Sequence, residues 1–369
     1  MPDPPRACVV GSGPGGLAVA ADLAGHYAVT ITDLPSFMGQ LDPVSAAGAV
    51  TVNSSWHGET AVEIVVAELD DALSGAELVV VAVPAPHHRT LAEAVVPGLA
   101  PGATLLFVGD GGGGLVAHAV LRRTARRDVL AAETNCLPHI SRSLGPGRIA
   151  ADRKTGGVMV AALPTERTED LRVRLAPVWP QLLCAMCAWD TLLLNYDAID
   201  TAPVALLNAA AIERRPGGFL LWGEGASPAV VRVIVAVDAE LLAVRQAIGG
   251  GGPGFHEMFV AQGLAPPADT FDRSLSLSKV LASVRPAGSP EALERLIATS
   301  LAWTLGVGAR LGCAAGVPTP TLDALVALGS AMLGRDLRDE ATTLASLDVE
   351  TVDLPTLVRV GRGADAMRF

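Results

Sequence analysis

Three glycines near the start of the chain have a spacing that lets a backbone approach a phosphate group. Gly11, Gly13 and Gly16 form a Gly-x-Gly-x-x-Gly motif. In such a motif the first glycine permits a tight turn, the second lets the main chain approach a pyrophosphate, and the third lets a helix pack against a strand. The free N–H groups at the start of that helix then bind the phosphates. The motif therefore predicts a dinucleotide site, and its candidate residues are Gly11, Ser12, Gly13, Pro14, Gly15 and Gly16.

Asp33 indicates which dinucleotide is bound. A carboxylate at this place accepts hydrogen bonds from the ribose hydroxyls and repels a 2′-phosphate. The segment 32–37 around it contains no arginine or lysine that would bind that phosphate. NAD is therefore favoured over NADP as the cofactor. FAD uses the same motif, but the remainder of the chain does not resemble a flavoprotein.

The residues around the motif have the pattern of the elements that must position it. The motif follows an apolar run, precedes a segment of helical composition, and is followed by a second apolar run at 27–32 that ends on Asp33. Further apolar runs, typical of parallel strands buried on both faces, lie at 78–84, 103–108 and 158–163. Helices are expected between them, at 90–96 and 115–127.

Ligands bind beyond the carboxyl ends of the strands in such a sheet. The turn after the run at 78–84 is therefore a candidate cofactor contact, with Val83, Pro84 and His88 as its residues. The glycine cluster 109–114 is a second candidate loop for cofactor or substrate.

The pattern changes after about residue 190. Helix-like runs lie at 205–212, 290–304 and 321–333, while 230–237 is rich in valine and fits either a helix or a strand. The glycines at 249–252 predict a mobile loop. We expect an α/β Rossmann domain that binds NAD over 1–190, and an all-helical domain for substrate binding and dimerisation over 191–369.

Composition excludes several classes of partner. The net charge of −11 argues against nucleic acid and anionic membranes. We see no secretory signal and no apolar run long enough to cross a bilayer, so we expect a cytoplasmic protein.

Cys184 and Cys187 have metal-ligand spacing, but no second pair lies nearby, so we expect core cysteines and no metal.

Several segments together resemble the opine dehydrogenase family, which includes octopine and nopaline dehydrogenases. Besides the glycine motif, the similar segments are 83–88, 132–138, 206–209 and 315–320. The resemblance implies a nucleotide domain followed by a helical domain, with the active site between them. It also implies reduction, by a nicotinamide hydride, of an imine formed from an amino acid and a 2-keto acid.

The chain departs from this family at the expected acid–base pair. By alignment on the segment 206–209, the family's catalytic histidine falls on Thr201. By alignment on the segment 315–320, its carboxylate partner falls on Ser300. No histidine lies between His139 and His256. Ketone reduction benefits from a general acid, whereas hydride addition to a protonated iminium yields a neutral amine and needs no proton donor. The loss therefore harms carbonyl reduction more than imine reduction.

Other polar residues could serve the same reaction. Asp197 and Asp200 could stabilise an iminium cation by charge or could be loop and cap residues. Thr134 could contact substrate or cap a turn, and His139 could be a relocated acid or a hydrogen-bonded core residue. With Thr201 and Ser300 these are the candidate catalytic residues, and the resemblance implies that the substrate lies among 134, 195–201 and 300.

Three functions remain open at this stage. The first is an opine-type oxidoreductase acting on a C=N bond, with a small amino acid and keto acid as substrates. The second is a reductase of a preformed or cyclic imine in specialised metabolism. The third is a cofactor-binding homologue that has lost catalysis. A homodimer is possible in each case.

Overall fold

The computed structural model describes residues 4–54, 58–109, 111–279, 281, 290–340 and 353–364. The chain divides into two compact units, each described by itself. The sheet unit comprises Met1–Gly109, Gly113–Lys154 and Val158–Cys184. The helical unit comprises Asp110–Gly112, Thr155–Gly157 and Ala185–Phe369.

The main sheet of the sheet unit has eight strands in the order β12-β11-β8-β7-β6-β1-β2-β5. Their bounds are β1 Arg6–Val10, β2 Ala28–Thr32, β5 Val65–Val66, β6 Leu78–Val81, β7 Thr104–Val108, β8 Leu130–Thr134, β11 Val158–Leu163 and β12 Leu182–Cys184. The neighbouring strands β5, β2, β1, β6, β7 and β8 are mutually parallel, and β11 pairs with β8 in the antiparallel direction. Strands β6, β7 and β11 are buried along their whole length. This burial explains the continuous apolar runs that predicted them.

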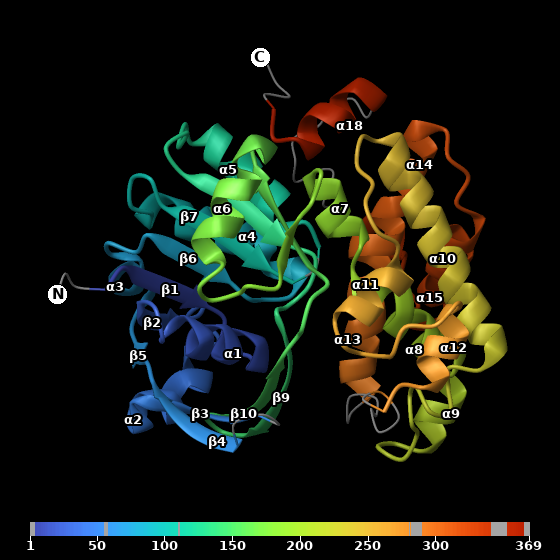
Figure 1. The fold of residues 1–369 in the computed structure, drawn as a ribbon, viewed down its shortest axis with the longest axis horizontal. Coiled ribbons are helices and arrows are strands. Elements are labelled where there is room, and N and C mark those ends of the chain that lie inside the picture. The colour runs from blue at the N-terminus through green and yellow to red at the C-terminus, as the bar shows by residue number, and fades with distance from the viewer. Residues whose placement is uncertain are drawn as a thin grey trace. The chain divides into compact units, whose positions relative to one another are not determined.

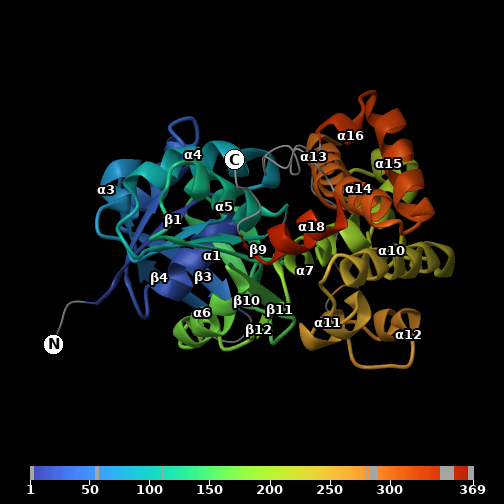
Figure 2. The same cartoon turned by 90° about the horizontal axis from the view of Figure 1, so that it is seen from above.

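Helices cover both faces of this sheet, as right-handed crossovers require. The helices are α1 Pro14–Leu23, α2 Asp42–Ala47, α3 Leu69–Leu73, α4 His88–Val95, α5 Gly113–Arg123 and α6 Thr168–Leu175, with the 3₁₀ turns η1 Met38–Leu41, η2 Ala85–His87, η3 Val96–Gly98 and η4 Thr165–Arg167. Helices α4 and α5 lie on one side of the strands, and α1 and α6 lie on the other (Figure 2). The Rossmann fold predicted from the sequence is confirmed.

A second sheet of four strands, in the order β4-β3-β10-β9, was not predicted. Its strands are β3 Ala49–Ser54, β4 Gly58–Glu63, β9 His139–Gly145 and β10 Arg148–Arg153. Strands β9 and β10 pack against α1. The central pairing of β3 with β10 is parallel and joins segments that are distant in the chain.

The remaining elements make up the helical unit, shown in green to red in Figure 1. They are α7 Ala188–Leu193, α8 Ala202–Leu207, α9 Ala209–Arg214, α10 Pro228–Ala247, α11 Phe255–Ala261, α12 Phe271–Ser276, α13 Pro290–Ser300, α14 Gly306–Ala315, α15 Pro320–Leu333, α16 Leu337–Glu340 and α18 Leu354–Gly361, with the π-helical segments η5 Asp197–Thr201 and η7 Leu301–Leu305. The valine-rich stretch left open by its sequence lies inside α10. Ser227 caps this helix by accepting a hydrogen bond from the N–H of Val230, and Pro228 occupies its first turn.

Among the described residues, Glu294–Ala315 is a helical stretch long and apolar enough to cross a membrane, but 72% of its apolar window is buried within the protein. That degree of burial is also expected of a core helix. The cysteine expectation is partly wrong: Cys187 is buried, whereas Cys184 is exposed because it ends the edge strand β12. No cluster of three or more potential metal ligands occurs in the part of the chain that the structure describes.

Candidate functional site

The glycine motif connects β1 to α1, and two of its glycines are required by close packing. Gly11 has φ +137°, and a Cβ atom there would lie 2.5 Å from the carbonyl oxygen of Ala82. A Cβ atom on Gly16 would overlap the carbonyl oxygen of Gly11. At Gly13, by contrast, a Cβ atom would have no neighbour within 4 Å. The backbone at Gly13 is therefore open to a ligand.

The start of α1 fits a phosphate group. Gly13 is the residue before the helix, and no side chain caps the N–H groups of its first turn. No acidic side chain lies in that turn either. Because a helix N-terminus carries uncompensated N–H groups and a partial positive charge, this end of α1 can hold an anion.

Asp33 lies directly beside the glycine motif. One of its carboxylate oxygens accepts the N–H of Ser12 at 2.7 Å and the other accepts the N–H of Leu34 at 2.7 Å. The Ser12 hydroxyl donates to the side-chain oxygen of Gln40 at 3.2 Å. These bonds hold the Asp33 carboxylate beside the glycine motif. The ribose of a bound dinucleotide would lie there, next to the phosphates. Gln40 was missed by the sequence analysis because a polar residue in a short 3₁₀ turn carries no motif.

His88 fixes the turn after β6. Its side chain is buried, packs edge-on against Phe107, and donates from Nε2 to the carbonyl oxygen of Val83 at 3.0 Å. Burial lowers the pKa of the His88 imidazole to about 4, so the ring is neutral at pH 7. The hydrogen bond from His88 therefore positions Val83 and the following Pro84. Contact of this turn with the cofactor stays a prediction.

The second glycine loop ends at a helix that is already capped. The buried carboxylate of Glu133 accepts the N–H of Gly114 at 2.9 Å and that of Leu115 at 3.4 Å, at the start of α5. This carboxylate disfavours an anion at that helix end. The neighbouring Thr134 is also buried, and its hydroxyl donates to the carbonyl oxygen of Cys136 at 2.8 Å. That bond is typical of a turn-stabilising residue.

His139 has a partner in the sheet unit. Its Nε2 lies 2.7 Å from the carboxylate of Asp22, which also accepts bonds from Arg153 and from the indole of Trp179. Burial raises the pKa of Asp22, but hydrogen bonds and charges from His139 and Arg153 outweigh it and keep the pKa below its ordinary value of 3.8. Asp22 lies near the C-terminal end of α1, about 12 Å along the helix from Pro14. This placement favours the interpretation of His139 as a hydrogen-bonded core residue.

In the helical unit, Thr201 and its two neighbouring carboxylates share the π-helical segment η5. The Thr201 hydroxyl lies 2.7 Å from a carboxylate oxygen of Asp200 and 3.4 Å from one of Asp197. Asp200 is buried and Asp197 is exposed. π-Helical turns inside helices are often found at functional sites. The carboxylates of Asp197 and Asp200 therefore lie close together beside the Thr201 hydroxyl.

Ser300 is the last residue of α13, and its side chain is buried. The second π-helical segment, η7, follows it directly, and η5 packs against both α13 and η7. The elements that carry Thr201 and Ser300 are therefore neighbours within the helical unit. In η7 the hydroxyl of Thr304 is buried and has no hydrogen-bond partner among the described residues.

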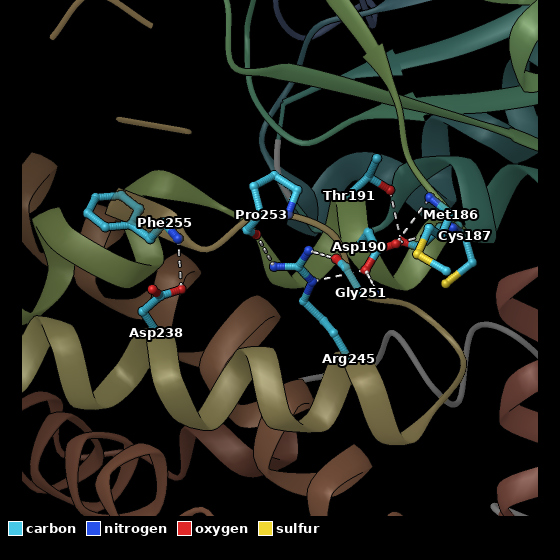
Figure 3. Close-up of polar contacts among 10 residues, drawn as sticks. Met186, Cys187, Asp190, Thr191, Asp238, Arg245, Gly251, Pro253 and Phe255 are labelled. Atoms are coloured by element: carbon cyan, nitrogen blue, oxygen red, sulfur yellow. Dashed lines mark hydrogen bonds and ion pairs between the residues drawn. The ribbon is translucent and has the colours of Figure 1, made fainter. Parts of the chain in front are cut away.

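A buried ion pair organises the segment that leads into η5 (Figure 3). Arg245 of α10 donates to Asp190 of α7 at 2.9 Å, and both side chains are at most 1% exposed. Arg245 also donates to the carbonyl oxygens of Gly251 and Pro253, and Asp190 accepts the N–H of Gly251 at 2.8 Å. The prediction of a mobile loop at 249–252 is therefore wrong, because a buried guanidinium and carboxylate hold it.

Comparison with known proteins supports the resemblance seen in the sequence. The model of the family described as NAD/NADP octopine/nopaline dehydrogenase, alpha-helical domain, matches residues 184–333. The chain is 27% identical over 342 residues to an opine dehydrogenase of Arthrobacter sp. (strain 1C), covering 92% of this chain and 94% of that protein.

Solved structures with the same fold include octopine dehydrogenase in complex with NADH and agmatine, with a TM-score of 0.76 and 17% identity over 99% of this chain and 100% of that one. Octopine dehydrogenase with NADH and L-arginine gives a TM-score of 0.77 at 18% identity, with the same coverage of 99% and 100%. Apo yersinopine dehydrogenase gives 0.70 at 14% identity, covering 94% of this chain and 99% of that one. The Rossmann sheet unit, the helical unit matched by the family model and a relative similar along nearly its whole length together support the resemblance of this chain to the opine dehydrogenase family.

Proposed function

We propose that this protein is an NAD(P)H-dependent oxidoreductase of the opine dehydrogenase type, which reduces a C=N bond formed from an amino acid and a 2-keto acid. The observation that carries the proposal is the open backbone at Gly13, above the uncapped start of α1. Gly11 and Gly16 accept no side chain there, so the turn is shaped for close approach of a ligand to the main chain. The resemblance to the opine dehydrogenase family then favours a nicotinamide dinucleotide as that ligand.

The residues present fit such a cofactor. When bound, it supplies a hydride. The N–H groups at the start of α1 hold its phosphates, and Asp33 accepts bonds from its ribose hydroxyls, which favours NAD over NADP. The structures of octopine dehydrogenase contain NADH, and one of yersinopine dehydrogenase contains NADP+. Both forms are thus used by proteins of this fold.

The substrate is assigned to the helical unit, at η5 and the end of α13. A primary amine and a ketone lose water to give a C=N bond, and protonation of its nitrogen gives an iminium cation. The carboxylates of Asp197 and Asp200 stabilise that cation by charge. Hydride addition to the carbon leaves a neutral amine, so Thr201 and Ser300 need not donate a proton.

Solved structures of octopine dehydrogenase contain agmatine, L-arginine or pyruvate. We therefore propose small amino acid and keto acid substrates. The Thr201 hydroxyl lies beside a carboxylate rather than an imidazole, and this observation favours a second candidate, reduction of a preformed or cyclic imine. The assignment of 191–369 as a substrate and dimerisation domain belongs to the same proposal.

A substrate screen tests the function directly. With NADH present, pairs of amino acids and 2-keto acids are expected to produce absorbance loss at 340 nm only when both partners are present, because the C=N bond must form first. Preformed cyclic imines form the second arm, and turnover with these alone would select the second candidate. Binding of NADH without turnover in either arm would indicate a homologue without catalysis.

A second measurement tests the role of Asp33. Asp33→Ala is expected to weaken NADH binding by about tenfold, since a hydrogen bond to a charged group contributes roughly 1.5–3 kcal/mol, and to reduce discrimination against NADPH. Affinities are measured by calorimetry, with folding checked by circular dichroism. Asp42→Ala, at an exposed acid on α2, is the control and should change neither affinity. Tighter binding of NADPH than of NADH by the unmodified protein would overturn this assignment.

A further inference from the structure

A cavity of about 430 Å³ lies in the sheet unit, away from the glycine motif. Its walls include Thr104 at the start of β7, Leu130 at the start of β8 and Pro164 after the end of β11. Because β11 runs antiparallel to β8, all three positions lie at the amino-terminal edge of the parallel strands. Gly11 follows β1 at the opposite, carboxyl-terminal edge. The cavity is therefore separate from the cofactor site.

Three arginines line this cavity: Arg127, Arg167 and Arg174. Arg174 lies on α6 and donates to the hydroxyl of Thr104, whose side chain is buried. This bond fixes the guanidinium against the cavity wall while using one of its five N–H donors. A guanidinium held in this way loses little conformational freedom when it binds a ligand.

The turn that carries Arg127 is also fixed. Ala125, at the end of α5, has φ +57°, a left-handed conformation that is costly for a residue with a side chain. The neighbouring Arg126 donates to the carbonyl oxygens of Val96 and Leu99, at 3.0 and 2.9 Å, and to Asp128. These bonds hold the turn in place, so Arg127 is presented to the cavity from a rigid backbone.

Among the residues that line the cavity, arginines outnumber acidic residues. Two carboxylates line it, those of Asp128 and Asp170. Asp128 forms an ion pair at 3.0 Å with Arg126, which is an additional cation beside the three lining arginines. Asp170 forms one at 3.2 Å with Arg167. The lining therefore suits an anion, and the two acids restrict the orientation in which it can bind.

We propose that this cavity binds a small oxyanion, a phosphate or a carboxylate group, through the guanidinium groups of Arg127, Arg167 and Arg174. Guanidinium forks match both kinds of oxyanion, because two parallel N–H groups can donate to two oxygens. The volume falls within the range of small-molecule sites, roughly 300–1,000 Å³. The proposal does not depend on the proposed enzymatic function, since it concerns the opposite edge of the sheet.

Calorimetric titration with inorganic phosphate and with citrate tests the site and separates the two sources of oxyanion. Arg174→Gln is expected to weaken binding of the preferred anion by about tenfold or more, because hydrogen bonds to charged groups are strong. Arg127→Gln is a second variant with the same expectation. Arg172→Gln is the matched control: it lies on the same helix but bonds Glu169 outside the cavity, and should bind as the unmodified protein does.

The titrations are repeated with saturating NADH. Phosphate bound at the start of α1 would be displaced by NADH, whereas an anion in the cavity would remain. Binding of phosphate or citrate that persists with NADH and is lost in Arg174→Gln supports the proposal. The proposal would be overturned if Arg174→Gln and Arg127→Gln bound the anion as tightly as the unmodified protein, or if Arg172→Gln lost as much affinity as they do. Displacement of the anion by NADH, or no binding of either anion, would also overturn it.

Discussion

Replacing Arg245 with methionine is expected to lower the free energy of unfolding by about 3–5 kcal/mol, the cost of leaving one member of a buried ion pair without its partner. Methionine keeps much of the side-chain volume but donates no hydrogen bond. The change strands the carboxylate of Asp190 and the carbonyl oxygens of Gly251 and Pro253 in the interior of the helical unit. Urea unfolding followed by circular dichroism measures the loss.

Two controls separate the buried charge from the loss of a side chain. Arg215 pairs with Glu224 at 2.9 Å on the surface, with exposures of 50% and 37%. Arg215→Met should therefore cost at most about 1 kcal/mol. Adding Asp190→Asn to Arg245→Met removes the stranded charge and should recover part of the stability. If Arg245→Met costs no more than Arg215→Met, the ion pair does not have this role.

Much of the sheet unit could be predicted because its signals are local. Strand β11 occupies the residues of its predicted apolar run, and β6 and β7 lie within theirs. A strand buried on both faces needs apolar residues at every position, so the run itself marks the element. The glycine motif is local in the same way, since its glycines lie close together in the chain. Gly11 and Gly16 are required by neighbouring carbonyl oxygens, and Gly13 leaves the turn open.

The second sheet and the fixed glycine loop have no such local signal. Strand β4 has no buried residue, so it shows no apolar alternation. The glycines at 249–252 predict a mobile loop because glycine allows many backbone conformations, yet Asp190 and Arg245, 55 positions apart, hold this loop by hydrogen bonds to Gly251. A weak signal was present: Arg245 is four positions from Leu241, on a buried face of α10. A charged residue on such a face requires a partner.

The candidate catalytic residues depend on tertiary packing that sequence alone does not supply. The sequence makes His139 a candidate acid, but its partner Asp22 is 117 positions away and no sequence pattern links the two residues. The π-helical segments η5 and η7 likewise have no compositional signature. Their packing against each other is consistent with the assignment of Thr201 and Ser300 to one site, and that assignment stays a prediction.

Thr201→His combined with Ser300→Asp is expected to raise kcat/KM for an amino acid and a 2-keto acid by about 10²–10⁴, the usual contribution of general acid–base catalysis. The new imidazole would assist loss of water during condensation, and the new carboxylate would orient it and stabilise its protonated form. NADH oxidation under steady-state conditions measures the gain, and thermal unfolding confirms that the double variant is folded.

The two hydroxyl positions also determine which controls are informative. Thr201→Gln with Ser300→Asn adds side chains of comparable size without an acid or base, and should give no gain. Ser300→Asp alone introduces a buried carboxylate in the helical unit that also holds Asp200, without a new cation, and should likewise give none. A gain confined to the double variant requires Thr201 and Ser300 to lie at one site, since an imidazole and a carboxylate cooperate only over a hydrogen-bond distance. A folded double variant with unchanged kcat/KM would show instead that the two hydroxyls do not occupy the positions of the family's acid–base pair.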